Sequence, residues 1–312
     1  MKRFLLGAVA VLALAASMPL VFENEYFFFA GYVVLQLIVL ATAWNILGGY
    51  AGYVNFGSGA FFAVGAYTAV ALYKAFALPL GLQILAGAAA AGLLGFGVGM
   101  LTLRLRGIFF SIATIAVAIV LETVVLNWHY VGGAKGLPTL RPTETPFFAS
   151  HTVYLFFVMA VIAVIAVGAA RYVETSWIGR GLRAIRDNEG AAECSGVPTL
   201  KLKLGAATLS GALMGAAGAP YAQYLSFIEP TSAFSLNHAV NALAMPIIGG
   251  MGHWMGPVIG AVLLGTVQQV VTVTISSEIN VLVVGVLLVV FVVAAPEGIL
   301  GLVKRWKKTF SK

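Results

Sequence analysis

The chain has 312 residues, of which 61% are hydrophobic and only 9% are charged, against about 25% charged residues in a typical soluble domain. This composition excludes a soluble globular protein, because so few charged side chains cannot cover its surface. The net charge of +7 does not indicate nucleic acid, since the basic residues fall at the ends of apolar segments. A single cysteine, Cys194, excludes an internal disulfide and a cysteine-rich metal site.

Apolar stretches recur along the whole chain at lengths near the roughly 20 residues that a membrane-spanning helix needs. They lie at residues 4–22, 27–47, 54–73, 82–103, 108–128, 151–172, 204–224, 238–251, 256–276 and 279–296. We therefore predict an all-α, polytopic transmembrane bundle of about 8–10 spans, forming one domain over residues 1–312. Glycines interrupt 54–73, and 238–251 is short and holds Pro246, so we expect a broken or re-entrant helix at each.

The first apolar stretch has two interpretations. Residues 1–20 have a basic start, an apolar core and small residues, which is the pattern of a cleaved signal peptide. The alternative is a retained first helix. We expect the retained helix, because ten crossings put both termini on one side of the membrane.

With ten crossings, most of the basic residues lie on the same side of the membrane. The basic tail 297–312, the segment 174–203 and the charges at the start of the chain all fall on one side, together with Arg104, Arg106 and Arg171. Only Lys74, Lys135 and Arg141 fall on the other side. Because loops rich in Lys and Arg stay in the cytoplasm, we predict that both termini are cytoplasmic.

A charged island interrupts the apolar sequence at residues 174–203 and cannot lie in hydrocarbon. Leu182 and Ile185 are three residues apart and share one helix face, while Arg183 and Arg186 lie on a neighbouring face. We expect a short amphipathic helix that seats its apolar residues in the groove of a partner protein. The alternative is a solvated loop whose charge only sets the topology.

Polar side chains inside membrane spans are costly, and they face either a cavity or a neighbouring helix. The candidates for a solute pathway are Asn45, Asn55, Ser58, Glu122 and Asn241. Hydrogen bonding between helices is the alternative role for each of them. Small residues between Gly205 and Gly218 are likewise suited either to a second subunit or to packing within the chain.

Sequence patterns of the common catalytic sites are absent. The chain has no glycine-rich loop followed by Lys-Ser or Lys-Thr, no HExxH zinc motif and no GxSxG nucleophile turn. We therefore expect no enzymatic activity, no metal site and no bound cofactor.

Several blocks in order resemble the permeases of bacterial branched-chain amino acid ABC importers of the LivM type. The blocks are WNILGGYAGYVNFGSGAFFAVGAYTA at 44–69, LTLRLRGIFFSIATIAVAIVLETVVLNW at 101–128 and GRGLRAIRDNEGAAECSGVPTLKLKLGAATLSGALMGAAGA at 179–219. Further similar stretches follow at 227–234, 247–265 and 295–301. The resemblance implies the ABC importer permease fold over roughly residues 30–302.

The resemblance also implies partners and a location. These are two ATPase subunits that hydrolyse the ATP, a second permease of the LivH type, a soluble solute-binding protein, and the lipid of the bacterial inner membrane, with no nucleic acid. Segment 174–203 then corresponds to the cytoplasmic loop that couples to the ATPases. The coupling residues that the resemblance implies are Gly179, Arg180, Leu182, Arg183, Ile185, Arg186, Glu189, Ala191, Ala192 and Gly196.

Three positions depart from the family pattern. Ser58 stands where members commonly have His, Ile119 where they have Glu, and Glu122 where they have Arg. Because of these changes, the solute is not determined. The possible solutes are branched-chain and other amino acids, urea, amides and aromatic acids. The alternative function is a secondary transporter or channel without ATPases, which requires ion-coupling carboxylates in the membrane, and only Glu122 is available for that role.

Overall fold

The computed structural model describes residues 2–20, 24–102, 105, 107–139, 150–274, 279–295 and 298–302. The α-helices are α1 (Lys2–Ser17), α2 (Glu25–Ala51), α3 (Ser58–Phe76), α4 (Leu80–Thr102), α5 (Ile108–Leu126), α6 (His151–Thr175), α7 (Trp177–Asp187), α8 (Glu189–Cys194), α9 (Thr199–Gly218), α10 (Tyr221–Leu225), α11 (Pro230–Ala233), α12 (Leu236–Gly249), α13 (Met255–Thr274) and α14 (Ile279–Ala294). Three-residue 3-10 helices are η1 (Met18–Leu20), η2 (His129–Val131) and η3 (Gly133–Lys135). Two short strands, β1 (Leu137–Pro138) and β2 (Phe227–Ile228), pair antiparallel with Leu137 opposite Ile228.

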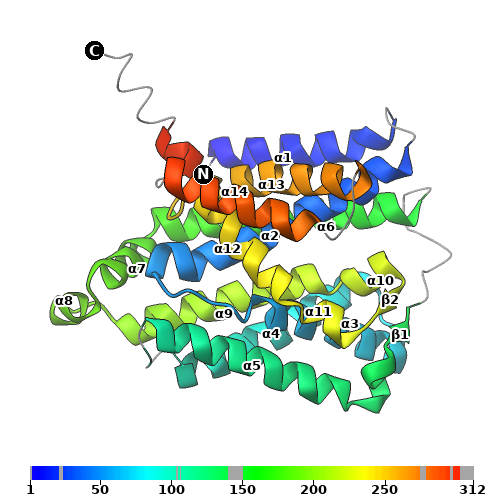
Figure 1. Cartoon of the computed structure of the whole chain (residues 1–312), viewed down its shortest axis with the longest axis horizontal. Helices are drawn as coiled ribbons and strands as arrows, with labels where there is room; N and C mark the ends of the chain where they lie inside the picture. The colour runs from blue at the N-terminus through cyan, green and yellow to red at the C-terminus, as the bar shows by residue number, and fades with distance from the viewer. Residues whose placement is uncertain are drawn as a thin grey trace.

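Each of the predicted spans coincides with a helix, and these helices are α1–α6, α9, α12, α13 and α14. Six of them, α2, α3, α4, α5, α6 and α13, are long and apolar enough to cross a membrane. The helices run side by side along the long axis of the molecule (Figure 1). The predicted polytopic helical membrane protein is therefore confirmed.

The broken helix predicted at 54–73 is present only in part, because residues 54–57 are non-helical but α3 is continuous from Ser58 to Phe76. Helix α2 ends at Ala51 and is capped by Gly52, whose φ of 78° lies in the left-handed region that favours glycine. Helix α3 begins only at Ser58, whereas Gly59 and Gly65 lie within it. The weak span at 238–251 is the 14-residue helix α12, which contains Pro246.

Residues 52–57 form a non-helical segment that runs back along α2 into the bundle (Figure 1). The Trp44 indole donates a hydrogen bond to the carbonyl of Asn55 at 2.8 Å, and Trp44 lies two helical turns, about 10 Å, before the end of α2. Helix α5 supplies Ser111, which donates to the Val54 carbonyl at 2.9 Å, and Thr114, which accepts from the Phe56 amide at 3.2 Å. Non-helical backbone is stable at membrane depth only when protein groups satisfy it in this way.

Helices α3, α4 and α9 meet backbone to backbone through small residues. A Cβ atom on Gly65 would collide with the backbone of Gly215, and one on Gly95 would lie 2.6 Å from the Ala207 carbonyl oxygen. Gly211 similarly faces Ala91 across α4. Most of the small-residue face at 205–218 therefore packs within the chain. Gly205, where an added Cβ meets nothing within 4 Å, is open.

We expect Gly215→Val to destabilise the protein by about 1–3 kcal/mol, the usual cost of forcing extra methyl groups into a packed core. An added Cβ at Gly215 has no room between Gly87 and Ala91 on α4. Gly205→Val on the same helix is the matched control, because it carries the same helix propensity change into open space. Thermal unfolding of the two purified variants in detergent measures the difference. Equal melting temperatures would contradict the packing described here.

The two ends of the bundle differ in structure. Helices α7 and α8 lie at one end, where α1 also begins and α14 ends (Figure 1). The paired strands β1 and β2 lie at the opposite end, together with α10 (Figure 1). Arg104, Arg106, Arg141 and the basic residues from Lys304 onward lie outside the described residues, so their predicted sides stay predictions.

Candidate functional site

Helix α7 packs one apolar face against the membrane bundle. Its buried residues are Gly179, Gly181, Leu182 and Ile185, and Leu182 and Ile185 are 0% and 3% exposed. The predicted amphipathic helix is present, but the prediction that Leu182 and Ile185 insert into a partner's groove was wrong. The reason is that α7 lies across the ends of the long helices, and both side chains belong to the same core cluster as Leu47 and Leu202.

Two arginines of α7 hold the last turns of two long helices. Arg186 Nη1 donates to the carbonyl of Gly49 in α2 at 2.9 Å, and Arg183 Nη2 donates to the carbonyl of Glu174 in α6 at 3.2 Å. The last four carbonyls of a helix lack partners within the helix and carry partial negative charge. The guanidinium groups therefore satisfy both the hydrogen bonds and the charge at these helix ends.

Helix α8 is fixed by a buried ion pair. The Glu189 carboxylate accepts from Lys203 Nζ on α9 at 2.6 Å and from the Tyr53 hydroxyl at 2.8 Å. The Glu189 and Lys203 side chains are 13% and 5% exposed. Asn188 caps α8 by accepting from the Ala191 amide at 3.0 Å. Because Tyr53 belongs to segment 52–57, this pair joins α8 both to α9 and to the non-helical segment.

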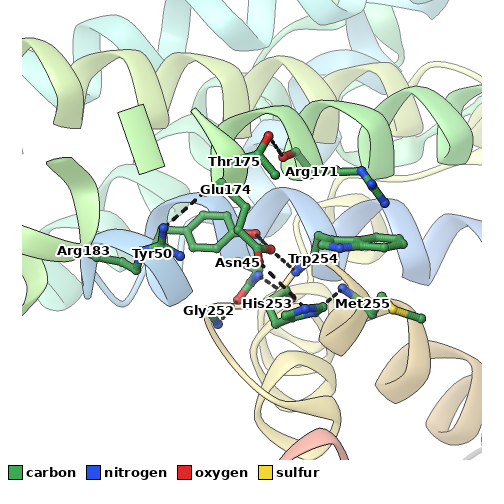
Figure 2. Close-up of polar contacts among 10 residues, drawn as sticks. All are labelled: Asn45, Tyr50, Arg171, Glu174, Thr175, Arg183, Gly252, His253, Trp254 and Met255. Atoms are coloured by element: carbon green, nitrogen blue, oxygen red, sulfur yellow. Dashed lines mark hydrogen bonds and ion pairs between the residues drawn. The ribbon is translucent and has the colours of Figure 1, made fainter. Parts of the chain in front are cut away.

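A second polar cluster surrounds the Glu174 carboxylate at the end of α6 (Figure 2). It accepts from the Tyr50 hydroxyl at 3.1 Å and from the Trp254 amide at 2.6 Å, and it lies 3.9 Å from His253 Nε2. Asn45 accepts from the Gly252 amide at 3.2 Å and donates to the His253 carbonyl at 3.4 Å. The loop at 250–254 is thereby attached to both α2 and α6.

The remaining predicted coupling residues divide between the interior and the surface. Gly179 is buried where α6 turns into α7, since a Cβ there would collide with the Val173 carbonyl. Ala192 is buried beneath α8. Arg180, Ala191 and Gly196 are exposed. The exposed side of α7 and α8, together with Asp187 and Glu193, is the part of this site that a partner protein can reach.

The predicted pathway residues are not gathered into one site. Asn55 and Ser58 are buried within and beside segment 52–57, where the Asn55 side chain accepts from the Gly57 amide at 2.8 Å. Asn241 on α12 accepts from Gln268 on α13 at 3.0 Å. Asn45 and Asn241 therefore join separate structural elements, whereas the side-chain bonds of Asn55 and Ser58 stay within residues 55–58. Their contact with a solute stays a prediction.

Glu122 differs from the other pathway candidates. It is half-buried on α5, and only 17% of the apolar window of that helix is buried, the smallest share among the six candidate spans. Within the described part of the chain, no hydrogen bond or ion pair holds its carboxylate. A carboxylate on a sparsely covered membrane helix faces either water or another protein, because lipid is too costly for it.

Sequence reasoning identified Arg183, Arg186 and Glu189 but missed two other residues, Glu174 and Lys203, that attach the hairpin formed by α7 and α8 to the bundle. Glu174 and Lys203 are the outermost charges of the 174–203 island, so each borders an apolar span. This position was the available signal that they turn inward. Their partners Tyr53 and Trp254 lie far away in the sequence, and no local pattern indicates them.

Comparisons with known proteins identify the family of the chain. The family described as the permease component of branched-chain amino acid transport systems matches residues 26–292. LivM, the high-affinity branched-chain amino acid transport system permease protein of Escherichia coli K12, is 27% identical over 94% of this chain and 74% of its own length. A probable LivH permease protein of Methanocaldococcus jannaschii is 26% identical over 63% of this chain and 64% of its own length. No solved structure matches the chain. The chain belongs to the permease-component family of branched-chain amino acid transport systems.

Proposed function

We propose that the chain is the membrane-spanning permease subunit of a binding-protein-dependent ABC importer for branched-chain amino acids or a related small solute. The observation that carries this proposal is the α7–α8 hairpin, which is charged on its outer side and bonded to several membrane helices on its inner side. Membership of the permease family supports it. A permease driven by separate subunits requires a surface of this kind to receive the movement of its ATPases.

The proposed importer contains two ATPase subunits, a second permease of the LivH type and a solute-binding protein. ATP hydrolysis belongs to the ATPase subunits. LivM and LivH of Salmonella typhimurium carry the name of the same transport system and both are similar to this chain, which supports a paired permease. We place the α7–α8 end and both termini in the cytoplasm of a bacterial cell, because Arg180 and Lys201 are exposed at that end.

Coupling would use the bonds at the inner side of the hairpin. When the ATPases close on nucleotide, they displace the exposed surface that carries Arg180, Asp187 and Ala191. Arg186 transmits the displacement to α2, Arg183 transmits it to α6, and Glu189 transmits it to α9. These helices then move relative to the rest of the bundle and open the pathway to alternating sides of the membrane. We place Glu122 on this pathway or at the second permease, since no described residue neutralises it.

The test is a mild-detergent pull-down of the tagged chain from native membranes. The variant combines Arg180→Glu with Ala191→Arg, two exposed positions whose change leaves the buried bonds intact. We expect the wild-type chain to recover the ATPase subunits and the variant to lose at least about nine-tenths of them. Exposed Lys135→Glu at the opposite end is the control, with recovery equal to wild type.

The outcomes separate the two functions. Loss of the ATPases only in the double variant supports the importer and locates its docking surface. Recovery of the chain alone in all three preparations would contradict the importer. It would favour a secondary transporter, for which Glu122, which no described residue neutralises, is the first ion-coupling candidate.

A further inference from the structure

A cavity of about 420 Å³ lies among α1, α2, α6 and α13, which is within the size range of small-molecule sites. Its walls are apolar and include Val11 of α1, Ile38 of α2, Val164 of α6 and Val258 of α13. The one charged residue in its wall is Arg171, near the end of α6 that leads into α7. An apolar chamber with a single cation at one end matches a ligand with a long apolar body and an anionic head.

The Arg171 guanidinium is held in place by aromatic rings. It lies 5.1 Å from the ring centre of Phe4 and 5.1 Å from that of Trp254. The nearest carboxylate along the helix, Glu174, is occupied by the Tyr50 hydroxyl and the Trp254 amide. Figure 2 shows Arg171 directed away from Glu174 and toward Trp254. Within the described residues Arg171 has no carboxylate partner, so its charge is available to an anion from outside the protein.

The surroundings of the cavity determine which anion fits. Its walls belong to membrane helices, where the solvent is lipid acyl chain rather than water. Trp254 is a residue type that concentrates at the level of the lipid headgroups, and basic pockets between membrane helices bind anionic headgroups. We propose that this cavity binds one anionic phospholipid. The phosphate pairs with Arg171, and an acyl chain lies between α1 and α6.

The bound lipid would occupy a defined place in the architecture. Phe4 packs against Gly168 of α6, where an added Cβ would lie 3.4 Å from its ring. The lipid fills the space beside this contact and so holds α1 against α6 and α13. It also abuts Trp254, whose amide binds Glu174. No residue that lines the cavity belongs to α7 or α8, so the test of this site does not depend on the importer proposal.

Two variants remove the two halves of the site, and each has a matched control. Gly7 lines the cavity and an added Cβ there meets nothing within 4 Å, so Gly7→Leu extends a side chain into the empty space. Gly97→Leu on α4 makes the same change at another open glycine outside this cavity. Arg171→Gln removes the charge that pairs with the phosphate. Lys74→Gln removes an exposed charge at the end of α3.

The measurement is native mass spectrometry of the chain, purified in mild detergent together with any subunits that copurify, and titrated with phosphatidylglycerol or phosphatidylcholine. We expect one tightly held phosphatidylglycerol per wild-type chain, with at least fivefold lower occupancy by phosphatidylcholine. Gly7→Leu and Arg171→Gln should each lower phosphatidylglycerol occupancy at least fivefold, and both controls should retain it.

Three outcomes would overturn the proposal. They are equal occupancy by the two lipids in the wild type, equal occupancy in the site variants and their controls, and an intact mass that lacks α1, which forms one wall of the cavity. If Gly7→Leu does not fold, Arg171→Gln against Lys74→Gln decides the question alone.

Discussion

Changing Arg183 and Arg186 together to Glu is expected to reduce solute uptake at least about tenfold while the chain still inserts into the membrane. Each arginine donates to a helix-end carbonyl, of Glu174 and Gly49 respectively. A hydrogen bond to a charged group contributes about 1.5–3 kcal/mol. A glutamate at either position places negative charge against an oxygen that is already partly negative. The hairpin then loses its attachment to α2 and α6.

The measurement is uptake of radiolabelled leucine by cells that express the whole importer, together with ATP hydrolysis by the purified complex. We expect hydrolysis to continue without transport, because the exposed residues Arg180 and Ala191 are unchanged. The control changes both arginines to Gln, which keeps hydrogen-bond donors and should retain a substantial part of the uptake. Uptake at the wild-type level in the Glu double variant would show that these bonds do not transmit the movement.

The second large effect is expected from Glu189→Ala, which leaves Lys203 charged and almost fully buried. Breaking one side of a buried ion pair costs about 3–5 kcal/mol, and the Lys203 side chain is 5% exposed. Replacing both partners, Glu189→Ala with Lys203→Met, also removes the buried lysine charge and should recover most of that loss. The free energy of unfolding of the single and double variants, measured by denaturant titration in detergent, gives the coupling between the two positions.

Lys201→Met is the control for the buried pair. It removes a lysine two residues away on the same helix, but its side chain is exposed, so we expect a change within about 0.5 kcal/mol. An equal loss of stability for Glu189→Ala and Lys201→Met would contradict the buried pair. A double variant that is less stable than Glu189→Ala would also contradict the buried pair.

The positions of the membrane helices followed from hydropathy because the bilayer permits few alternatives. Backbone groups in hydrocarbon must bond within the segment, so each long apolar stretch becomes a helix. The same rule explains where prediction was incomplete. Segment 52–57 leaves helical geometry because Trp44, Ser111 and Thr114 satisfy its backbone. Two of these side chains come from α5, more than 50 residues away, so no local pattern shows them.

In the candidate site, too, features that depend on neighbouring residues were predictable, whereas contacts with residues distant in the sequence were not. Helical spacing correctly placed Leu182 and Ile185 on one face. Spacing shows that a face is apolar, but it does not show which protein surface packs against that face. The structure covers it with the protein's own core. The roles of Glu174 and Lys203 depended on distant partners, Trp254 and Tyr53, that fold back onto them. Pathway residues remain predictions because bonds between helices account for the contacts of Asn45 and Asn241.

The glycine contacts among α3, α4 and α9 have a mechanical consequence. Where helices touch through backbone atoms, no side chain lies between them that can change rotamer and absorb a push. Helix α9 carries Lys203 near one end and Gly215 near the other, and Gly215 lies against both Gly65 and Gly87. A displacement of α8 is therefore expected to move α9 as a rigid body. We expect the movement to reach the middle of α3 and α4 through these backbone contacts.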